Sequence, residues 1–328
     1  MTSKMRAVTQ RKYGSPDVLE VVDLDRPTPE AGSVLVRVEA ASVNPLDWHM
    51  MRGAPYVARL QNGIRRPKRT TFGTDVAGVI VSVGAEVATW KVGDEVFGTA
   101  IGSCAEFALS RQNSLATKPP GVGFQVAAAT PIAAVTALQA LRDKGEVARG
   151  QRVLVNGAGG GVGTFAVQIA KALGSDVTGV CSEGKVDMVR SIGADRVIDY
   201  TTDDFTIGDL RYDVIIDTVG NRQFSDLRRV LTPTGRYVVV GGPDNGRVLG
   251  PLNHLIKAKL AFAFAPQKAL PILAGVNMKD LELLGQMLAD GRVKPVIDRT
   301  CNLVETADAV RYVEAGHASG KVVVVVNG

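Results

Sequence analysis

The sequence contains few cysteines, and they lie far apart. Cys104, Cys181 and Cys301 are the only three among 328 residues. An odd, scattered set gives no disulfide framework and suits a reducing compartment. We therefore expect apolar cores to stabilise the fold, and a chain of this length with 45% hydrophobic residues can form more than one.

Long apolar runs are also missing. The N-terminus has no apolar h-region of the kind found in signal peptides. The longest charge-free run, residues 119–141, is rich in alanine but contains Pro120, Gln125 and Pro131. We interpret it as a buried pair of helical pieces rather than a membrane span. These absences favour a cytoplasmic protein. The net charge of +5 suits anionic ligands as readily as nucleic acid.

The length predicts about two domains, and the sequence pattern changes near Phe124. Before this point, short β-branched runs such as residues 34–40 and 76–83 are separated by glycine- and proline-rich turns, which predicts a compact barrel-like β domain. Beyond it, strands alternate with helices, which predicts an α/β fold with a doubly wound parallel sheet. The expected strands are residues 152–156, 176–181, 196–199, 213–217 and 236–240, with helices over 163–173 and 185–192. A last apolar run, residues 321–326, comes too late for this sheet and could return to the first domain.

A glycine-rich turn joins the first of these strands to the helix that follows it. The segment Gly157-Ala-Gly-Gly-Gly-Val-Gly163 has a strand before it and a helix after it, which is the context that a dinucleotide-binding motif requires. Its glycines permit a tight turn, and free N–H groups at the helix start can bind a pyrophosphate. We therefore expect Gly157, Gly160, Gly161, Val162 and Gly163 to bind the cofactor.

The end of the second strand indicates which dinucleotide is bound. An NAD site usually has a carboxylate there, roughly 20 residues beyond the glycines, for the ribose 2′-hydroxyl. This chain has Cys181 and Ser182, followed by Lys185. A hydroxyl and an ammonium suit a 2′-phosphate, so we expect NADPH. Glu183 is the evidence against this choice, because it would favour NADH if it faced the ribose.

Several motifs in order along the chain carry a family resemblance. They are Ser42-Val-Asn-Pro-Leu-Asp-Trp-His-Met-Met-Arg-Gly53, Phe72-Gly-Thr-Asp-Val-Ala-Gly78, Val92-Gly-Asp-Glu-Val-Phe-Gly98, Gly160-Gly-Val-Gly163 and Gly193-Ala-Asp-Arg-Val-Ile-Asp-Tyr200. Over residues 6–326 the chain resembles the medium-chain dehydrogenase/reductase superfamily, and within it the zinc-free quinone and enone reductases, including the reticulon-4-interacting-protein-like branch.

The resemblance implies a Rossmann domain over residues 125–266 and a GroES-like β-barrel catalytic domain split between residues 1–124 and 267–328. It also implies a cleft between them for the nicotinamide, and a homodimer. By similarity, further residues would contact the cofactor: Tyr200 at the 2′-phosphate, Asn44 at the nicotinamide ribose, Thr136 with Gly241 and Gly242 at the nicotinamide, and His317 at the phosphates.

The family comparison also predicts that no zinc is bound. Zinc-dependent relatives use a cysteine, a histidine and a third ligand, and here Asn44 and Thr74 stand in the first two places. Catalytic zinc needs about three strong protein ligands. Three scattered cysteines also exclude the family's four-cysteine structural site. Asp47 and His49 alone would make an incomplete site.

Without a Lewis acid, hydride transfer to a quinone or to the β-carbon of an enone is easier than oxidation of a simple alcohol. We take Asn44, Asp47 and His49 as candidate catalytic residues. The proton donor stays open among Asp47, His49 and Tyr56. Two other functions also stay open: an NAD(P)-dependent alcohol dehydrogenase or carbonyl reductase, and an NADPH-binding regulatory protein with weak turnover.

Residues 59–69 form a basic stretch with five positive charges and no acid. It is either a solvated loop or a loop near the cleft that attracts an anionic cofactor or substrate. Because the stretch lacks interleaved aromatic residues for base stacking, nucleic acid is the least favoured partner. The expected partner is a small-molecule quinone or enone.

Overall fold

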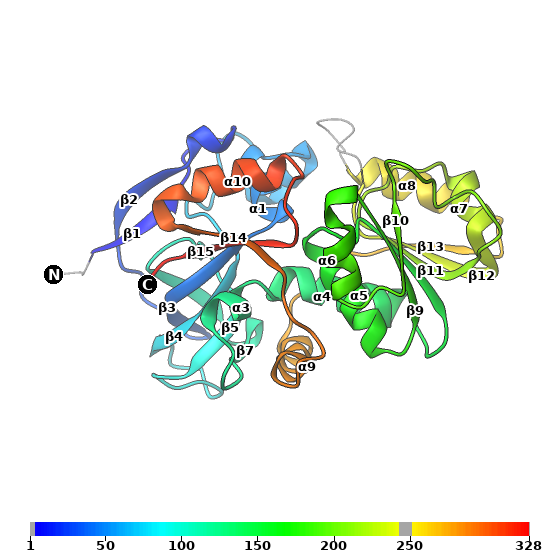
Figure 1. Ribbon diagram of the computed structural model, residues 1–328. Helices are drawn as coiled ribbons and strands as arrows, with labels where there is room; N and C mark the ends of the chain where they lie inside the picture. Colours follow the sequence, from blue (N-terminus) through cyan, green and yellow to red (C-terminus); the bar gives the residue numbers. More distant parts are fainter. Residues whose placement is uncertain (1–3, 243–250, 328) are drawn as a thin grey trace. The chain divides into compact units, whose positions relative to one another are not determined.

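The computed structural model describes residues 4–242 and 251–327. Its contacts divide the chain into two units, whose elements are labelled in Figure 1. The first unit comprises Met1–Val135, Val276–Gly291 and Ile297–Gly328, and the second comprises Thr136–Gly275 and Arg292–Val296. We expected divisions after residues 124 and 266, and the contacts divide the chain after residues 135 and 275. The second difference arises because strand β13 (Lys268–Pro271) belongs to the sheet of the second unit.

The first unit is built on a seven-stranded sheet with strand order β14-β15-β3-β4-β5-β7, in which β6 also pairs with β3. A separate antiparallel pair joins β1 to β2. The C-terminal strand β15 pairs with β3, so the expected return of the last apolar run is confirmed. The strand bounds are β1 (Lys4–Thr9), β2 (Glu20–Asp25), β3 (Ser33–Val43), β4 (Asp75–Val83), β5 (Glu95–Thr99), β6 (Phe107–Arg111), β7 (Leu115–Thr117), β14 (Ile297–Asn302) and β15 (Lys321–Val325).

Both ends of the chain contribute to the core of the first unit. Val34, Val36 and Val38 alternate along β3 and are fully buried, and Val322 and Val324 of β15 pack in the same cluster. This alternation is the period of two that a strand with one core-facing side requires. The helices of this unit are α1 (Pro45–Arg52), α2 (Arg59–Asn62), α3 (Phe124–Ala128), α9 (Met278–Ala289) and α10 (Thr306–Glu314), with 3₁₀ turns at Pro16–Val18, Tyr56–Ala58, Gln112–Ser114 and Leu303–Glu305.

The second unit contains a six-stranded parallel sheet with strand order β10-β9-β8-β11-β12-β13. This is the order 3-2-1-4-5-6 of a doubly wound dinucleotide-binding fold, so the expected α/β class is confirmed. The bounds are β8 (Arg152–Asn156), β9 (Asp176–Cys181), β10 (Arg196–Asp199), β11 (Tyr212–Asp217), β12 (Leu231–Val239), α5 (Gly161–Ala172), α6 (Val186–Ser191), α7 (Phe224–Val230) and α8 (Pro251–Ala261), with a π turn at Ala140–Lys144 and a 3₁₀ turn at Glu183–Lys185.

The helices of the second unit follow from the crossover connections. Helices α5 and α6 contact β8, β9 and β10, whereas α7 and α8 contact β12 and β13. Helix α5 begins at Gly161, two residues before the expected start, because Gly160 has an extended backbone and serves as its N-cap. Residues 119–141 contain α3 and α4 (Pro131–Gln139), which confirms the expected helical pieces. Within the described ranges, no helix has the length and apolar character to cross a membrane.

Candidate functional site

The glycine-rich turn of the second unit has a backbone that other residues could not adopt without strain. Gly157 has a φ of +84°, in the left-handed region that favours glycine. A Cβ atom at Gly163 would lie 2.0 Å from the carbonyl oxygen of Gly157, which is closer than any real contact. Glycine at these positions therefore lets the strand, the turn and helix α5 pack against one another.

The start of α5 offers N–H groups to an anion. The Gly160 N-cap has no side chain to accept these hydrogen bonds, and the first intrahelical bond runs from the Thr164 N–H to the Gly160 carbonyl. The first-turn N–H groups of Gly161, Val162 and Gly163 therefore point to the end of the helix, where its dipole is positive. The donors and the absence of side-chain bulk suit the pyrophosphate of a dinucleotide.

The turn also lies where the sheet reverses its winding. Strands β8 and β11 are neighbours, and their carboxyl ends are joined by a 2.8 Å hydrogen bond from the Asn156 side chain to Asp217. Ligands of open α/β sheets bind outside the carboxyl ends of the strands at such a switch point. Gly241 follows β12 at the same end, and a Cβ atom there would lie 2.4 Å from the Thr218 carbonyl oxygen.

The residues expected to select the cofactor gather at the next strand ends. Ser182 follows β9, and the Tyr200 N–H donates to the Cys181 carbonyl, so Tyr200 and Ser182 flank the ends of adjacent strands. The stem of Lys185 lies across the glycine turn, because a Cβ atom at Gly159 would be 2.6 Å from the Lys185 Cδ atom. Glu183 is exposed in the intervening 3₁₀ turn.

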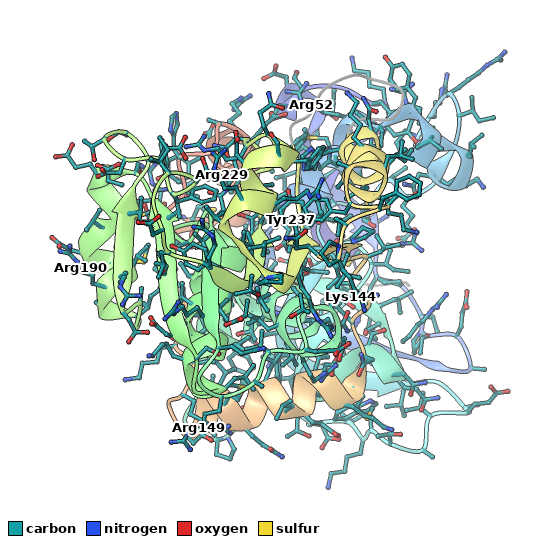
Figure 2. The ribbon with its side chains drawn as sticks, turned by 90° about the vertical axis from the view of Figure 1, so that its right-hand side faces the viewer. Arg52, Lys144, Arg149, Arg190, Arg229 and Tyr237 are labelled. Carbon is teal, nitrogen blue, oxygen red and sulfur yellow. The ribbon has the colours of Figure 1, made fainter. Side chains whose placement is uncertain are left out.

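Sequence reasoning missed a hydrogen-bonded chain of three side chains in the second unit. The Tyr237 hydroxyl donates to Asp217 Oδ2 at 2.8 Å, and His254 Nε2 lies 3.2 Å from the same hydroxyl. Because the tyrosine proton is given to the carboxylate, His254 Nε2 must be the donor in the second bond. Burial raises the pKa of Tyr237 and lowers that of His254. Tyr237 lies in the interior of the unit, whereas Arg190 projects from α6 (Figure 2).

The expected catalytic segment of the first unit is fixed by a buried charge network around Asp75. Its Oδ2 atom accepts from the Ser42 hydroxyl at 2.7 Å and from the Asn44 amide at 2.8 Å. The Lys321 ammonium lies 3.4 Å away and also donates to Asn44 Oδ1, so both ends of the Asn44 carboxamide are bound. Asp75 Oδ1 accepts the Ile132 N–H at the start of α4. The side chains of Asp75 and Lys321 are 0% and 3% exposed.

Asp47 lies beside this network on α1. The Thr74 hydroxyl donates to its Oδ1 atom at 2.7 Å, and the Asn44 N–H donates to its Oδ2 atom at 2.8 Å as part of a capping box. Burial raises the pKa of Asp47 to about 6, and the charge of Asp75 adds to this rise. The Thr74 and Asn44 hydrogen bonds and the charge of Lys321 oppose it.

A cavity of about 170 Å³ opens in the first unit, and both Asp47 and Thr74 line it. The other polar side chains in its wall belong to Gln10, Asn62, Arg69 and Thr71. The cavity therefore brings an acid with a raised pKa, a hydroxyl group and an apolar surface into one place. Sequence reasoning identified Asp47 as a candidate and left open that the basic stretch containing Arg69 lies near the cleft, but it gave no sign that Gln10 would lie near Asp47.

The remaining candidates occupy separate positions. His49 is half-buried and stacks on Trp48, and Tyr56 is 40% exposed with Arg59 over its ring. Neither residue lines the cavity. His317 is exposed in the first unit after α10, and Thr136 is half-buried on α4. Among the described residues, no three or more His, Cys, Asp or Glu side chains are grouped to hold a metal ion.

Comparisons with known proteins agree with these features. The sequence model of the protein family described as alcohol dehydrogenase GroES-like domain matches residues 30–184. The family model described as zinc-binding dehydrogenase matches residues 192–324. The chain is 34% identical over 337 residues to the 2-methylene-furan-3-one reductase of Solanum lycopersicum, covering 98% of this chain and 79% of the relative. It is 34% identical over 325 residues to the mitochondrial NAD(P)H oxidoreductase RTN4IP1 of Mus musculus, covering 89% and 81%.

A solved structure shows the same architecture along its whole length. The quinone oxidoreductase from Coxiella burnetii matches with a TM-score of 0.86 at 29% identity, covering 98% of this chain and 99% of that one. The fold, the site and the relatives together define an NAD(P)H-dependent oxidoreductase. Within that class, the chain belongs to the medium-chain dehydrogenase/reductase superfamily, in its quinone-oxidoreductase-like branch.

The buried network predicts a large stability loss when its cation is removed. We expect Lys321→Met to destabilise the first unit by about 3–5 kcal/mol, because Asp75 then keeps a buried charge without its ion-pair partner. Trp48 and Trp90 are the only tryptophans and both lie in the first unit, so their fluorescence during urea unfolding reports on it. Lys4→Met, which removes an exposed pair with Asp25, is the control and should cost less than about 1 kcal/mol. Equal losses of stability in the two variants would contradict the role of Lys321 as the buried ion-pair partner of Asp75.

Proposed function

We propose that the protein is a zinc-independent, NADPH-dependent reductase of quinones or α,β-unsaturated carbonyl compounds. The observation that carries this proposal is the Asp47–Thr74 pair in the wall of the cavity. It provides a proton source in the segment where zinc-dependent relatives bind metal. The names of the tomato and Coxiella proteins, a 2-methylene-furan-3-one reductase and a quinone oxidoreductase, support the same substrate class.

Zinc independence is proposed although one of the matching family models is described as zinc-binding. Asn44 and Thr74 stand where the resemblance implies the first two ligands. Asn44 uses both ends of its carboxamide in the Asp75 network, and Thr74 donates to Asp47. An amide and a hydroxyl in these arrangements do not supply the three strong ligands that catalytic zinc needs. We therefore assign Asn44 a positioning role.

For the cofactor, we infer that Gly157, Gly160, Gly161, Val162 and Gly163 hold the pyrophosphate, with Gly241, Gly242, Thr136 and His317 contributing as the resemblance implies. Ser182, Lys185 and Tyr200 would surround a 2′-phosphate. The position of Lys185 across Gly159 and the exposed position of Glu183 support NADPH over NADH. When bound, NADPH supplies a hydride to the acceptor.

The choice of NADPH can be tested at Lys185. We expect Lys185→Glu to weaken NADPH binding by roughly tenfold or more, since a charge-assisted contact is replaced by repulsion, while NADH affinity changes little. Fluorescence titration with both cofactors measures this difference. Glu183→Gln, in the same 3₁₀ turn, is the matched control and should not weaken NADPH. A similar loss for both cofactors in Lys185→Glu would refute the 2′-phosphate contact.

Asp47 and Thr74 would complete the reduction by delivering a proton. When Asp47 is protonated, its O–H can donate to the Thr74 oxygen, which frees the Thr74 hydroxyl to donate to the acceptor oxygen. Negative charge builds on that oxygen as hydride adds to the β-carbon of an enone or to a quinone. One hydride and one proton then yield the saturated carbonyl compound from an enone, or the hydroquinone from a quinone.

This role predicts a pH dependence with a definite sign. The pKa of Asp47 is raised to about 6 in the folded protein, so the acid form predominates below pH 6 and is lost above it. We therefore expect kcat with an enone to fall as pH rises through about 6. Asp47→Asn should abolish this fall of kcat with rising pH. It should also lower kcat by about 10²-fold or more, because general acid catalysis contributes that much.

Stopped-flow or steady-state rates from pH 4.5 to 8.5 measure how kcat falls with pH. Asp187→Asn is the control, since the Asp187 side chain is fully exposed in the second unit. If kcat of Asp47→Asn still falls through about pH 6, the group that titrates is not Asp47.

The reaction itself is tested by following NADPH absorbance with quinones, enones, aldehydes and alcohols. Turnover of quinones or enones supports the proposal, and turnover of aldehydes or alcohols alone would support an alcohol dehydrogenase or carbonyl reductase. Tight NADPH binding without any turnover would point to a regulatory protein. Stoichiometric zinc in a metal assay would overturn zinc independence.

A homodimer is supported by the edge of the second unit's sheet. Strand β13 is the last in the strand order and pairs only with β12 among the described residues, and such an edge can pair with a second copy. Phe264 and Leu273 flank it and are almost wholly exposed. We expect a mass of two chains in sedimentation velocity and a single-chain mass for Leu273→Asp. Ile207→Asp, elsewhere on the same unit, should stay dimeric; a monomeric wild type would refute the proposal.

A further inference from the structure

The cavity in the first unit has room for a small ring. Its volume is about 170 Å³, and its apolar surface comes from Leu46, Met50, Met51, Phe72, Ala100 and Ile101. An apolar protein cavity of about 150 Å³ accommodates one benzene molecule. The cavity beside Asp47 and Thr74 therefore suits an acceptor with a single six-membered ring.

Gln10 brings an amide to this cavity that the protein does not satisfy. The backbone around it is fixed by two contacts. The Gln10 N–H donates to the Thr70 carbonyl at 2.7 Å, and Thr9 forms an isolated antiparallel β-bridge with Thr71. The side chain is only 5% exposed, and its Oε1 atom has no hydrogen-bond partner within residues 4–242 and 251–327. A buried amide without a partner is disfavoured unless a ligand provides one. Because amide nitrogen and oxygen exchange by a flip, Gln10 can present either a donor or an acceptor.

Arg69 adds a positive charge to the same wall. It is the last residue of the basic stretch 59–69. The arginines at the two ends of this stretch have different surroundings. Arg59 is structural, because it lies over the rings of Tyr13 and Tyr56 and donates to the Gly53 carbonyl. Arg69 lines the cavity, is exposed, and has no ion pair in the part of the chain that the structure describes. A guanidinium and an amide in one wall suit a carboxylate.

We propose that this cavity selects a single-ring enone or quinone that carries a carboxylate, with Arg69 pairing with the carboxylate and Gln10 donating to it. This inference deepens the proposed function and rests on it. It assigns Gln10 and Arg69 as specificity-determining residues, while Asp47 and Thr74 act on the reacting carbonyl group. The basic stretch of residues 59–69 would then contribute a substrate-binding residue to the cavity and would not be only a solvated loop.

The test compares 2-cyclohexenone with the same ring bearing a 4-carboxylate. We expect the wild type to favour the carboxylate by about tenfold in kcat/KM, because a charge-assisted contact is worth that factor or more. Arg69→Gln should remove most of this preference by raising KM for the carboxylate while leaving cyclohexenone unchanged. Gln10→Leu, which keeps the side-chain size, should reduce the preference in the same direction.

Arg66→Gln is the matched control. Arg66 belongs to the same basic stretch and is exposed, but it does not line the cavity, so its loss should change neither substrate by more than about twofold. Equal effects of Arg66→Gln and Arg69→Gln would replace the local contact with a general electrostatic field. A wild type that uses both substrates equally well would overturn the inference and leave the proposed function standing.

Direct binding separates the two proposals when no turnover occurs. Titration calorimetry of the 4-carboxylate into protein saturated with NADP⁺ would then measure affinity without chemistry. Binding that Arg69→Gln weakens by about tenfold would support the carboxylate site while the proposed reaction fails. Absence of binding, or binding that Arg69→Gln leaves unchanged, would overturn the site.

Discussion

The burial of the Asp75 carboxylate is the constraint on which the first unit depends. A carboxylate removed from water is strongly disfavoured unless charge and hydrogen bonds replace its hydration. Its partners come from β3 through Ser42, from the N-cap of α1 through Asn44, from α4 through the Ile132 N–H and from β15 through Lys321. Satisfying one charge therefore fixes four segments, including one that lies 246 residues further along the chain. The last strand thus holds the segment that contains Ser42 and Asn44 in place.

Next to this satisfied network, the cavity wall contains groups that the protein leaves incompletely satisfied. Asp47 is buried within the field of Asp75, which disfavours its ionised form, and the Gln10 amide oxygen has no partner among the described residues. Natural proteins depart from full satisfaction mainly at functional sites. The contrast separates roles among neighbouring residues: Asn44 and Lys321 are engaged on all sides and position the segment, whereas Asp47, Thr74 and Gln10 face the space where a ligand can lie.

The sequence predicted those parts of the fold in which the signal is local. Strands β8, β9 and β10 have the expected bounds because each is a short apolar run between turn residues, and the glycine turn has its strand and helix on either side. Strand β13 was missed, since four residues containing Pro271 carry little strand signal. Lys321 was missed as part of the buried network because its partners Asn44 and Asp75 are distant in sequence. A lysine at the head of five consecutive valines was the available sign that a charge would be buried there.

The candidate sites in the two units offer different chemistry to a ligand, which bears on how such an enzyme could change its specificity. In the second unit the glycine turn offers backbone N–H groups and close approaches that no side chain could share, so the turn is fixed by geometry. In the first unit the cavity is lined by side chains beside the buried Asp75 network, and in the proposed reaction only Asp47 and Thr74 would meet the reacting carbonyl group. Substituting Gln10 or Arg69 leaves the buried Asp75 network untouched. On this proposal, substitutions at Gln10 or Arg69 can change the acceptor, whereas a change at Asn44 or Lys321 alters the buried network itself. The proposal is therefore consistent with one fold serving several acceptors through changes in its site residues.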